Sequence, residues 1–252
     1  MAQNIYDDAK FFDGYSQFPR SREGLAAAAE WPSLRAMLPD LRGKSILDLG
    51  CGFGYFAAWA AQQGAAEIHA IDLSENMLAV ARDTCAGLPV TFERADLETA
   101  QFDTARYDLV FSSLAVHYLE DFAGFCARVR RALKDEGHFV FSTEHPVFAA
   151  RANPEFMSDA EGYLVGAVSD YLREGQRRTN WIADGVVKYH RLISTTINTL
   201  QSAGLSLDQI EEWSASDADI AAHPEWEKER YQPMFLLLAT SVDPLVPISS
   251  LP

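Results

Sequence analysis

Short apolar runs and amphipathic stretches alternate from residue 44 onward, and this pattern predicts strands separated by helices. Between the runs, residues 55–63 are rich in alanine, and Ser74 can cap a helix that follows it. After Asp121, apolar side chains recur at steps of three and four, the spacing of a helix with one buried face. The runs that we expect to be buried strands are 44–50, 67–73, 90–97, 107–114 and 137–143. This order of elements predicts an α/β fold with a mostly parallel sheet.

The alternation stops after His145, where a segment of mixed character begins. Residues 146–188 combine glycine, proline, charged and aromatic side chains, so we interpret them as an insertion after the fifth strand, formed by a hairpin or short helices. The α/β pattern then resumes with a helix from about Tyr189 to Ala203 and strands near Ser206–Trp213 and Met234–Val242.

These elements divide the chain into five segments. We expect N-terminal helices, near 25–30 and 34–38, and a frayed proline-containing tail. The segments are 1–40 (N-terminal helices), 41–145 (core), 146–188 (insertion), 189–242 (remainder of the core) and 243–252 (tail). The insertion's aromatic side chains could enclose a flat or apolar substrate, and they are Phe148, Phe156, Tyr163, Tyr171 and Trp181.

Composition excludes several classes of protein. A chain of 252 residues with 48% hydrophobic content is typical of a folded globule. The net charge of −15 repels phosphate backbones, so we expect neither nucleic acid nor, given the short apolar runs, a membrane as a partner. The N-terminus lacks the basic and apolar parts of a secretory signal. Three scattered cysteines, Cys51, Cys85 and Cys126, argue against a disulfide scaffold or a zinc site and suit the reducing cytoplasm.

The segment Asp48–Gly54 (DLGCGFG) is the most informative part of the chain. Alternate glycines after a strand permit a tight turn and let a ligand approach the backbone closely. The dinucleotide fingerprint requires glycine or alanine where Tyr55 stands, which argues against a nicotinamide cofactor. Asp72, at the end of the second strand, can accept both hydroxyls of a ribose, and Asp96, at the end of the third, is placed to meet an adenine.

Four motifs in this order resemble the class I S-adenosylmethionine-dependent methyltransferases, especially their type 11 and ubiquinone-biosynthesis-like branch. The motifs are DLGCGFG (48–54), AIDLS (70–74), ADLE (95–98) and YDLVFSSLAVHYLED (107–121). The resemblance covers about residues 40–145 and the last strand pair. It implies a Rossmann-like, seven-stranded, mostly parallel sheet with an antiparallel last strand. It also implies S-adenosylmethionine as cofactor and a small-molecule methyl acceptor.

The resemblance further implies which residues bind the cofactor. The glycine turn would line its methionine part, and the two acids named above would bind ribose and adenine. The residues implied are Asp48, Gly50, Cys51, Gly52, Gly54, Asp72, Leu73, Asp96, Leu97, Ser113 and Leu114, with Tyr15 and Arg20 from residues 1–40, which would fold over the cofactor as a helical lid. Residues 41–145 would form the cofactor-binding core, and the insertion, 146–188, would cover the substrate.

Methyl transfer from a sulfonium is a direct displacement, so the protein mainly aligns the reactants. A base is needed only if the acceptor must lose a proton, and the candidates are His117, His145 and His190. Each of these histidines could instead serve only the structure, by stabilising a turn or the start of a helix. The sequence does not identify the acceptor, and it does not say whether oxygen, nitrogen or carbon is methylated. A homodimer is possible, but the sequence does not determine the oligomeric state. Two alternatives also stay open: a non-catalytic protein that binds the cofactor or its demethylated product, and a nicotinamide-linked oxidoreductase.

Overall fold

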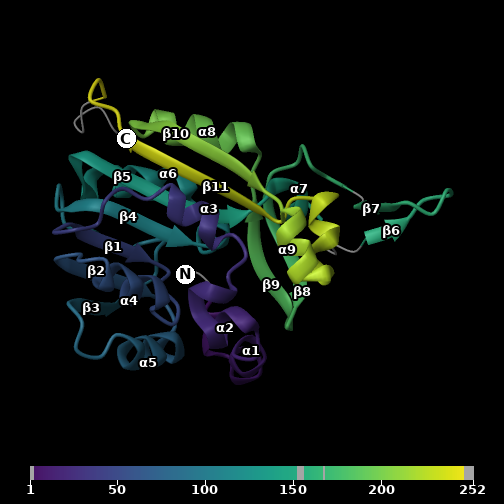
Figure 1. Cartoon of the computed structure of the whole chain (residues 1–252). Coiled ribbons are helices and arrows are strands. Elements are labelled where there is room, and N and C mark those ends of the chain that lie inside the picture. Colours follow the sequence, from purple (N-terminus) through teal and green to yellow (C-terminus); the bar gives the residue numbers. More distant parts are fainter. Residues whose placement is uncertain (1–2, 152–155, 167, 247–252) are drawn as a thin grey trace.

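A seven-stranded sheet forms the centre of the computed structural model, which describes residues 3–151, 156–166 and 168–246. The strand order is β10-β11-β5-β4-β1-β2-β3 (Figure 1). β11 runs antiparallel to both of its neighbours, and the other pairs described in this sheet are parallel. The strands are β1 (Ser45–Leu49), β2 (Glu67–Asp72), β3 (Val90–Arg94), β4 (Tyr107–Ser113), β5 (Leu133–Glu144), β10 (Leu205–Trp213) and β11 (Phe235–Val242). The predicted mostly parallel sheet with an antiparallel last strand is therefore confirmed.

Helices cover both faces of the sheet, as parallel strands require. Along β1, Ile46 packs into one hydrophobic core, whereas Leu47 and Leu49 pack into the other. The first core lies under α3 (Trp31–Ala36) and α4 (Tyr55–Gln62), with α5 (Glu75–Thr84) beside α4. The second core lies under α6 (Phe122–Ala132) and α8 (Ile193–Ser202). No helix in the described ranges is long and apolar enough to cross a membrane.

Two predicted helix starts are confirmed by their caps. The Ser74 side chain accepts a hydrogen bond from the backbone N–H of Met77 at the start of α5. The Asp121 carboxylate accepts one from the N–H of Gly124 at the start of α6. Each cap satisfies a backbone donor that the first helical turn leaves without a partner.

The N-terminal segment forms short helices whose bounds differ from the prediction. They are η1 (Ile5–Asp7), α1 (Ala9–Tyr15), α2 (Pro19–Glu23), η2 (Gly24–Ala27) and α3. The predicted bounds of the helices, 25–30 and 34–38, were wrong. Pro32 stands in the first turn of α3 and favours a helix start at Trp31. In Figure 1, α1 and α2 lie at one end of the sheet, on the side of β8 and β9, whereas α3 lies over the sheet.

The insertion consists mainly of two hairpins outside the central sheet. Its elements are α7 (Pro146–Ala149), β6 (Phe156–Ser158), β7 (Leu164–Gly166), β8 (Gly175–Trp181) and β9 (Ala183–His190). The predicted helix from Tyr189 was wrong at its start. Alternate burial of Val186, Lys188 and His190 follows the two-residue period of a strand, and the helix begins only at Ile193.

The remaining connections contain short helices. These are η3 (Val116–Tyr118), α9 (Asp217–Ala222) and η4 (Pro224–Arg230). The predicted third strand ends at Arg94, so Asp96 stands in the turn that follows it. Of the predicted tail, residues 247–252 lie outside the described part of the chain.

Candidate active site

A cavity of about 1010 Å³ opens where the parallel strands of the central sheet end. The N-terminal helices, the β8–β9 hairpin and residues that follow β10 enclose it (Figure 1). Open α/β sheets bind ligands at this edge. Its volume lies at the upper limit of the roughly 300–1,000 Å³ of ordinary ligand pockets, which leaves room for two small molecules.

The glycine turn forms one wall of the cavity, and its three glycines have different tasks. Gly50, Gly52 and Gly54 all have positive φ angles, of 76°, 53° and 77°. A Cβ at Gly50 would lie 2.4 Å from the Cβ of Ala115, whereas a Cβ at Gly52 would meet nothing within 4 Å. A Cβ at Gly54 would lie 3.1 Å from that of Ala81 in α5. Gly52 therefore exposes backbone to the ligand, and Gly54 lets two helices pack closely outside the cavity lining.

Asp72 is held at the end of β2 with both carboxylate oxygens oriented by the backbone. The N–H of Gly52 donates to Oδ2 and that of Ser74 to Oδ1, each at 2.9 Å. Each oxygen still has a lone pair for a second donor. Burial raises the pKa of this carboxyl, although the backbone hydrogen bonds oppose the shift. A carboxylate held in this way can accept two further hydrogen bonds, such as those that the two hydroxyls of a ribose would donate.

Asp48, in β1, adds a second buried carboxyl to the same wall. Only 2% of the residue is exposed, and Oδ2 has no hydrogen-bond partner among the described residues. Burial raises the pKa of Asp48 well above its ordinary value, and the nearby charge of Asp72 adds to the shift. An unpartnered carboxyl beside a second acid suits a ligand that carries positive charge.

The structure brings nearly all of the predicted cofactor residues together. Those that line the cavity are Asp48, Gly50, Cys51, Gly52, Asp72, Leu73, Asp96, Leu97, Ser113, Leu114, Tyr15 and Arg20. Gly54 is the exception, for the packing reason given above. The three cysteines are free thiols, and no group of three His, Cys, Asp or Glu in residues 3–151, 156–166 and 168–246 could hold a metal ion.

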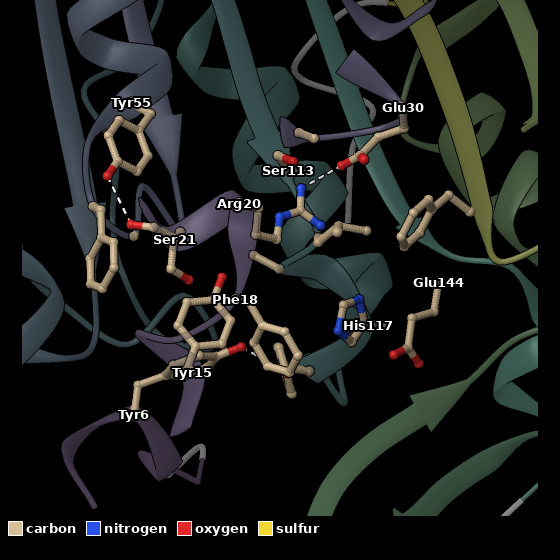
Figure 2. Close-up of a pocket in the computed structure, with 18 of the residues that line it drawn as sticks. Tyr6, Tyr15, Phe18, Arg20, Ser21, Glu30, Tyr55, Ser113, His117 and Glu144 are labelled. Atoms are coloured by element: carbon tan, nitrogen blue, oxygen red, sulfur yellow. Dashed lines mark hydrogen bonds and ion pairs between the residues drawn. The ribbon is translucent and has the colours of Figure 1, made fainter. Parts of the chain in front are cut away.

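The N-terminal segment (residues 3–40, the predicted lid) lies beside this wall and makes specific contacts. Tyr6 Oη lies 3.0 Å from Tyr118 Oη, and within the segment Arg20 forms an ion pair of 2.6 Å with Glu30 (Figure 2). Asp7 accepts hydrogen bonds from the Ser74 hydroxyl at 2.5 Å and from the backbone at the start of α5. The lid therefore contacts both sides of the cavity.

Of the three candidate bases, only His117 lines the cavity. His145 accepts from the N–H of Val147, and its Nε2 donates to Glu212 at 2.8 Å. His190 donates from Nε2 to the carbonyl of Tyr171 at 2.7 Å. These contacts give His145 and His190 structural tasks outside the cavity.

His117 is buried, and its environment keeps the imidazole neutral. Burial lowers its pKa well below the ordinary 6.5, and the charges of Lys188 and Arg191 add to the effect. Its Nδ1 has no hydrogen-bond partner among the described residues. A neutral imidazole beside a ligand cavity can accept a proton.

Sequence reasoning missed two groups that line the cavity, Lys188 and Glu30. Lys188 forms a buried ion pair with Glu144, and its Nζ lies 5.0 Å from the centre of the Trp181 ring. Lys188 was missed because the insertion was predicted only as a hairpin or short helices, with no strand register to show which of its side chains face inward. Glu30 was missed because only the fold brings it to Arg20.

The predicted aromatic cover is only partly at the cavity. Phe148 and Trp181 line it, and Phe18 of the lid stacks on Trp181 at 5.9 Å between ring centres. Phe156, Tyr163 and Tyr171 are not in its lining. The hairpin of β6 and β7 projects away from the body in Figure 1, which explains why Tyr163 is exposed.

Comparison with known proteins places this geometry among methyltransferases. A methyltransferase domain family matches residues 47–141. An S-adenosylmethionine-dependent methyltransferase from Mesorhizobium loti is 49% identical, with a TM-score of 0.84, and the match covers 86% of this chain and 100% of that one. A candidate enzyme of the same class from Listeria monocytogenes is 38% identical, with a TM-score of 0.80 and coverage of 87% and 99%. An uncharacterised protein of Haemophilus influenzae is 31% identical over 90% of each chain.

Proposed function

Because this chain belongs to the family of S-adenosylmethionine-dependent methyltransferases, we propose that it methylates a small molecule bound in the same cavity as the cofactor. One observation carries this proposal. The cavity extends without interruption from the glycine turn and Asp72 to Lys188 and Trp181 of the insertion. A non-catalytic binder of the cofactor would need only the first part of this space.

The residues of the glycine-turn wall fit the cofactor. Gly52 offers bare backbone, and Asp72 offers two oriented oxygens for a ribose. The unpartnered carboxyl of Asp48 suits the positive charges of the sulfonium and amino groups. When bound, S-adenosylmethionine supplies a methyl group on a positively charged sulfur, which is already activated for transfer.

The chain's own contribution to the reaction is alignment, exclusion of water and transfer of a proton. The lid and the insertion bring Phe18 and Trp181 together over the cavity, so closure keeps water from the reacting groups. Alignment of the two reactants in line lowers the barrier without covalent help from the protein. His117, the candidate base that lines the cavity, takes the proton of an acceptor that must lose one, although burial makes its imidazole a weak base.

A small molecule is favoured over a macromolecule by enclosure and by charge. The aromatic walls come from three separate segments, which surround the ligand rather than leave an open groove. The net charge of −15 disfavours nucleic acid.

Calorimetric titration with S-adenosylhomocysteine tests the cofactor half of the site. Asp72→Ala should weaken binding about tenfold or more, because it removes hydrogen bonds to a charged acceptor. Asp83→Ala, which changes an exposed acid on α5, is the matched control and should bind as the wild type does. Equal affinity of the Asp72 variant and the wild type would contradict the ribose assignment.

The acceptor half is tested with methyl-labelled S-adenosylmethionine and a whole extract of bacterial cells, which is separated after the reaction into low-molecular-mass, protein and nucleic acid fractions. We expect the label in a small-molecule product, and slower labelling by about 10²–10⁴-fold for His117→Gln if the acceptor loses a proton. Label that appears only in protein or nucleic acid fractions would refute the proposal.

A further inference from the structure

The ion pair of Lys188 with Glu144 is the main charged feature of the acceptor half of the cavity. The side chains are only 8% and 12% exposed, and both residues line the cavity. An ammonium group has three N–H donors. Glu144 accepts one, and the face of Trp181 lies 5.0 Å from the nitrogen. These contacts leave one donor direction of Lys188 for a ligand.

This ion pair lies close to the expected position of the transferred methyl group. Glu144 is the last residue of β5, whose Ser142 is in register with Ser113 of β4. The N–H of Leu114 donates to the carbonyl of Ser142 at 3.0 Å. Ser113 and Leu114 are the residues expected to border the donor sulfur. Figure 2 shows Ser113, His117 and Glu144 around the same part of the cavity.

The charges at this position discriminate between kinds of acceptor. Lys188 and Glu144 cancel each other, and burial raises the pKa of Tyr6 and Tyr118, so both phenols stay neutral. His117 is neutral for the reasons given above. A protonated amine has no lone pair to accept the free N–H of Lys188, whereas an anionic oxygen would accept it in a strong charge-assisted hydrogen bond. Sulfur accepts such bonds only weakly.

We propose that Lys188 binds the nucleophilic atom of the acceptor and that this atom is an oxygen that reacts as an anion. The inference rests on the proposed function and names its acceptor class. Glu144 is a positioning residue, because its ion pair holds the ammonium group of Lys188 in place.

The reaction balances with groups already named. The acceptor oxygen forms the new bond to the methyl carbon with its own electron pair. The electron pair of the broken methyl–sulfur bond stays on sulfur, which becomes a neutral thioether. A hydroxyl acceptor gives its proton to the imidazole of His117, and a carboxylate acceptor has none to give. A phenolic hydroxyl and a carboxylate would thus both be bound as anionic oxygens by Lys188, but only the hydroxyl needs His117 to take its proton.

Two aromatic probes separate these sources in the complex with S-adenosylhomocysteine, which carries no sulfonium charge. The first is p-nitrophenol, whose ionisation is visible in its absorbance, and the second is benzoate, followed by calorimetry. A nearby ammonium should lower the pKa of the bound phenol by about one unit, a roughly tenfold change in its ionisation constant. If the site accepts carboxylates, benzoate should bind more tightly than benzylamine.

The variants are chosen so that no buried charge is left alone. Removal of one partner of a buried ion pair is strongly destabilising, whereas replacement of both is often neutral. The double variant Lys188→Met with Glu144→Gln should abolish the pKa shift of the bound phenol, and it should weaken benzoate binding about tenfold. Lys188→Arg should retain both effects, because it keeps a cation at this position.

Each outcome is informative when S-adenosylhomocysteine affinity is measured beside it. Three results would overturn the inference. The pKa shift of the bound phenol could survive in the double variant, benzylamine could bind more tightly than both anions, or neither anion could bind to a protein that still binds S-adenosylhomocysteine. Loss of S-adenosylhomocysteine binding by the wild type would instead overturn the proposed function.

Discussion

Replacement of Asp48 by asparagine should stabilise the ligand-free protein and weaken its hold on the cofactor. The residue is only 2% exposed, and one of its oxygens has no hydrogen-bond partner among the described residues. An unpartnered buried polar group costs about 1–3 kcal/mol, and burial of a charge costs more than burial of an amide. We therefore expect Asp48→Asn to raise the free energy of unfolding by about 1–3 kcal/mol.

The effect depends on pH in a definite direction. The folded-state pKa of Asp48 lies above its ordinary value of 3.8, so the folded protein holds a proton that the unfolded chain has lost. Stability of the wild type therefore falls as pH rises from 3.8 toward the folded-state pKa. Asparagine removes this loss, so the advantage of the variant should widen across that window.

Thermal unfolding with and without S-adenosylmethionine measures both parts of the prediction. For a chain of this size, each kcal/mol moves Tm by about 2–4 °C. The variant should have the higher Tm without ligand, and a smaller rise in Tm when the ligand is added, because the charge that favours the cationic cofactor is gone.

Asp108→Asn is a control that should change the free energy of unfolding in the opposite direction. Asp108 lies in β4 and accepts hydrogen bonds from Lys134 at 2.7 Å and from the N–H of Ser45 at 2.9 Å. These partners lower its pKa although partial burial opposes them, so its loss should destabilise the protein. A lower Tm for Asp48→Asn without ligand, or an undiminished ligand effect, would refute the reasoning.

Three further predictions concern the turn, a structural histidine and acid stability. Gly50→Ala should weaken S-adenosylhomocysteine binding in calorimetry by about tenfold or more, because the new Cβ would lie 2.4 Å from that of Ala115. Gly87→Ala is the control, since Gly87 also has a positive φ but has open space around it, and this variant should bind as the wild type does. His145→Ala should lower Tm, yet leave that affinity unchanged, because its contacts lie outside the cavity. The folded-state pKa of His117 lies below 6.5, so the unfolded chain binds a proton more readily than the folded protein. The free energy of unfolding, measured in urea, should therefore fall as pH drops below 6.5, and it should fall less steeply in His117→Gln.

Local signals in the sequence were sufficient for the sheet and for the cofactor half of the site. The run before Gly50, the alternate glycines and the acid at the end of the next strand lie within one βαβ unit. Neighbouring parallel strands end at the same edge of a sheet, so Gly52 and Asp72 had to meet once that unit formed. Cap residues such as Ser74 act within one helical turn and are equally readable.

Only the tertiary structure decided which groups face the acceptor. Lys188 and Glu144 come from the insertion and the core, and Arg20 meets Glu30 only through the turns of the N-terminal helices. His117, His145 and His190 looked equivalent as residues near strand ends, yet burial and hydrogen bonding by distant partners left only His117 at the cavity. Strand and helix periods report which face of an element is buried, but they do not report what lies across from it. That is set by long-range packing, which no local pattern encodes.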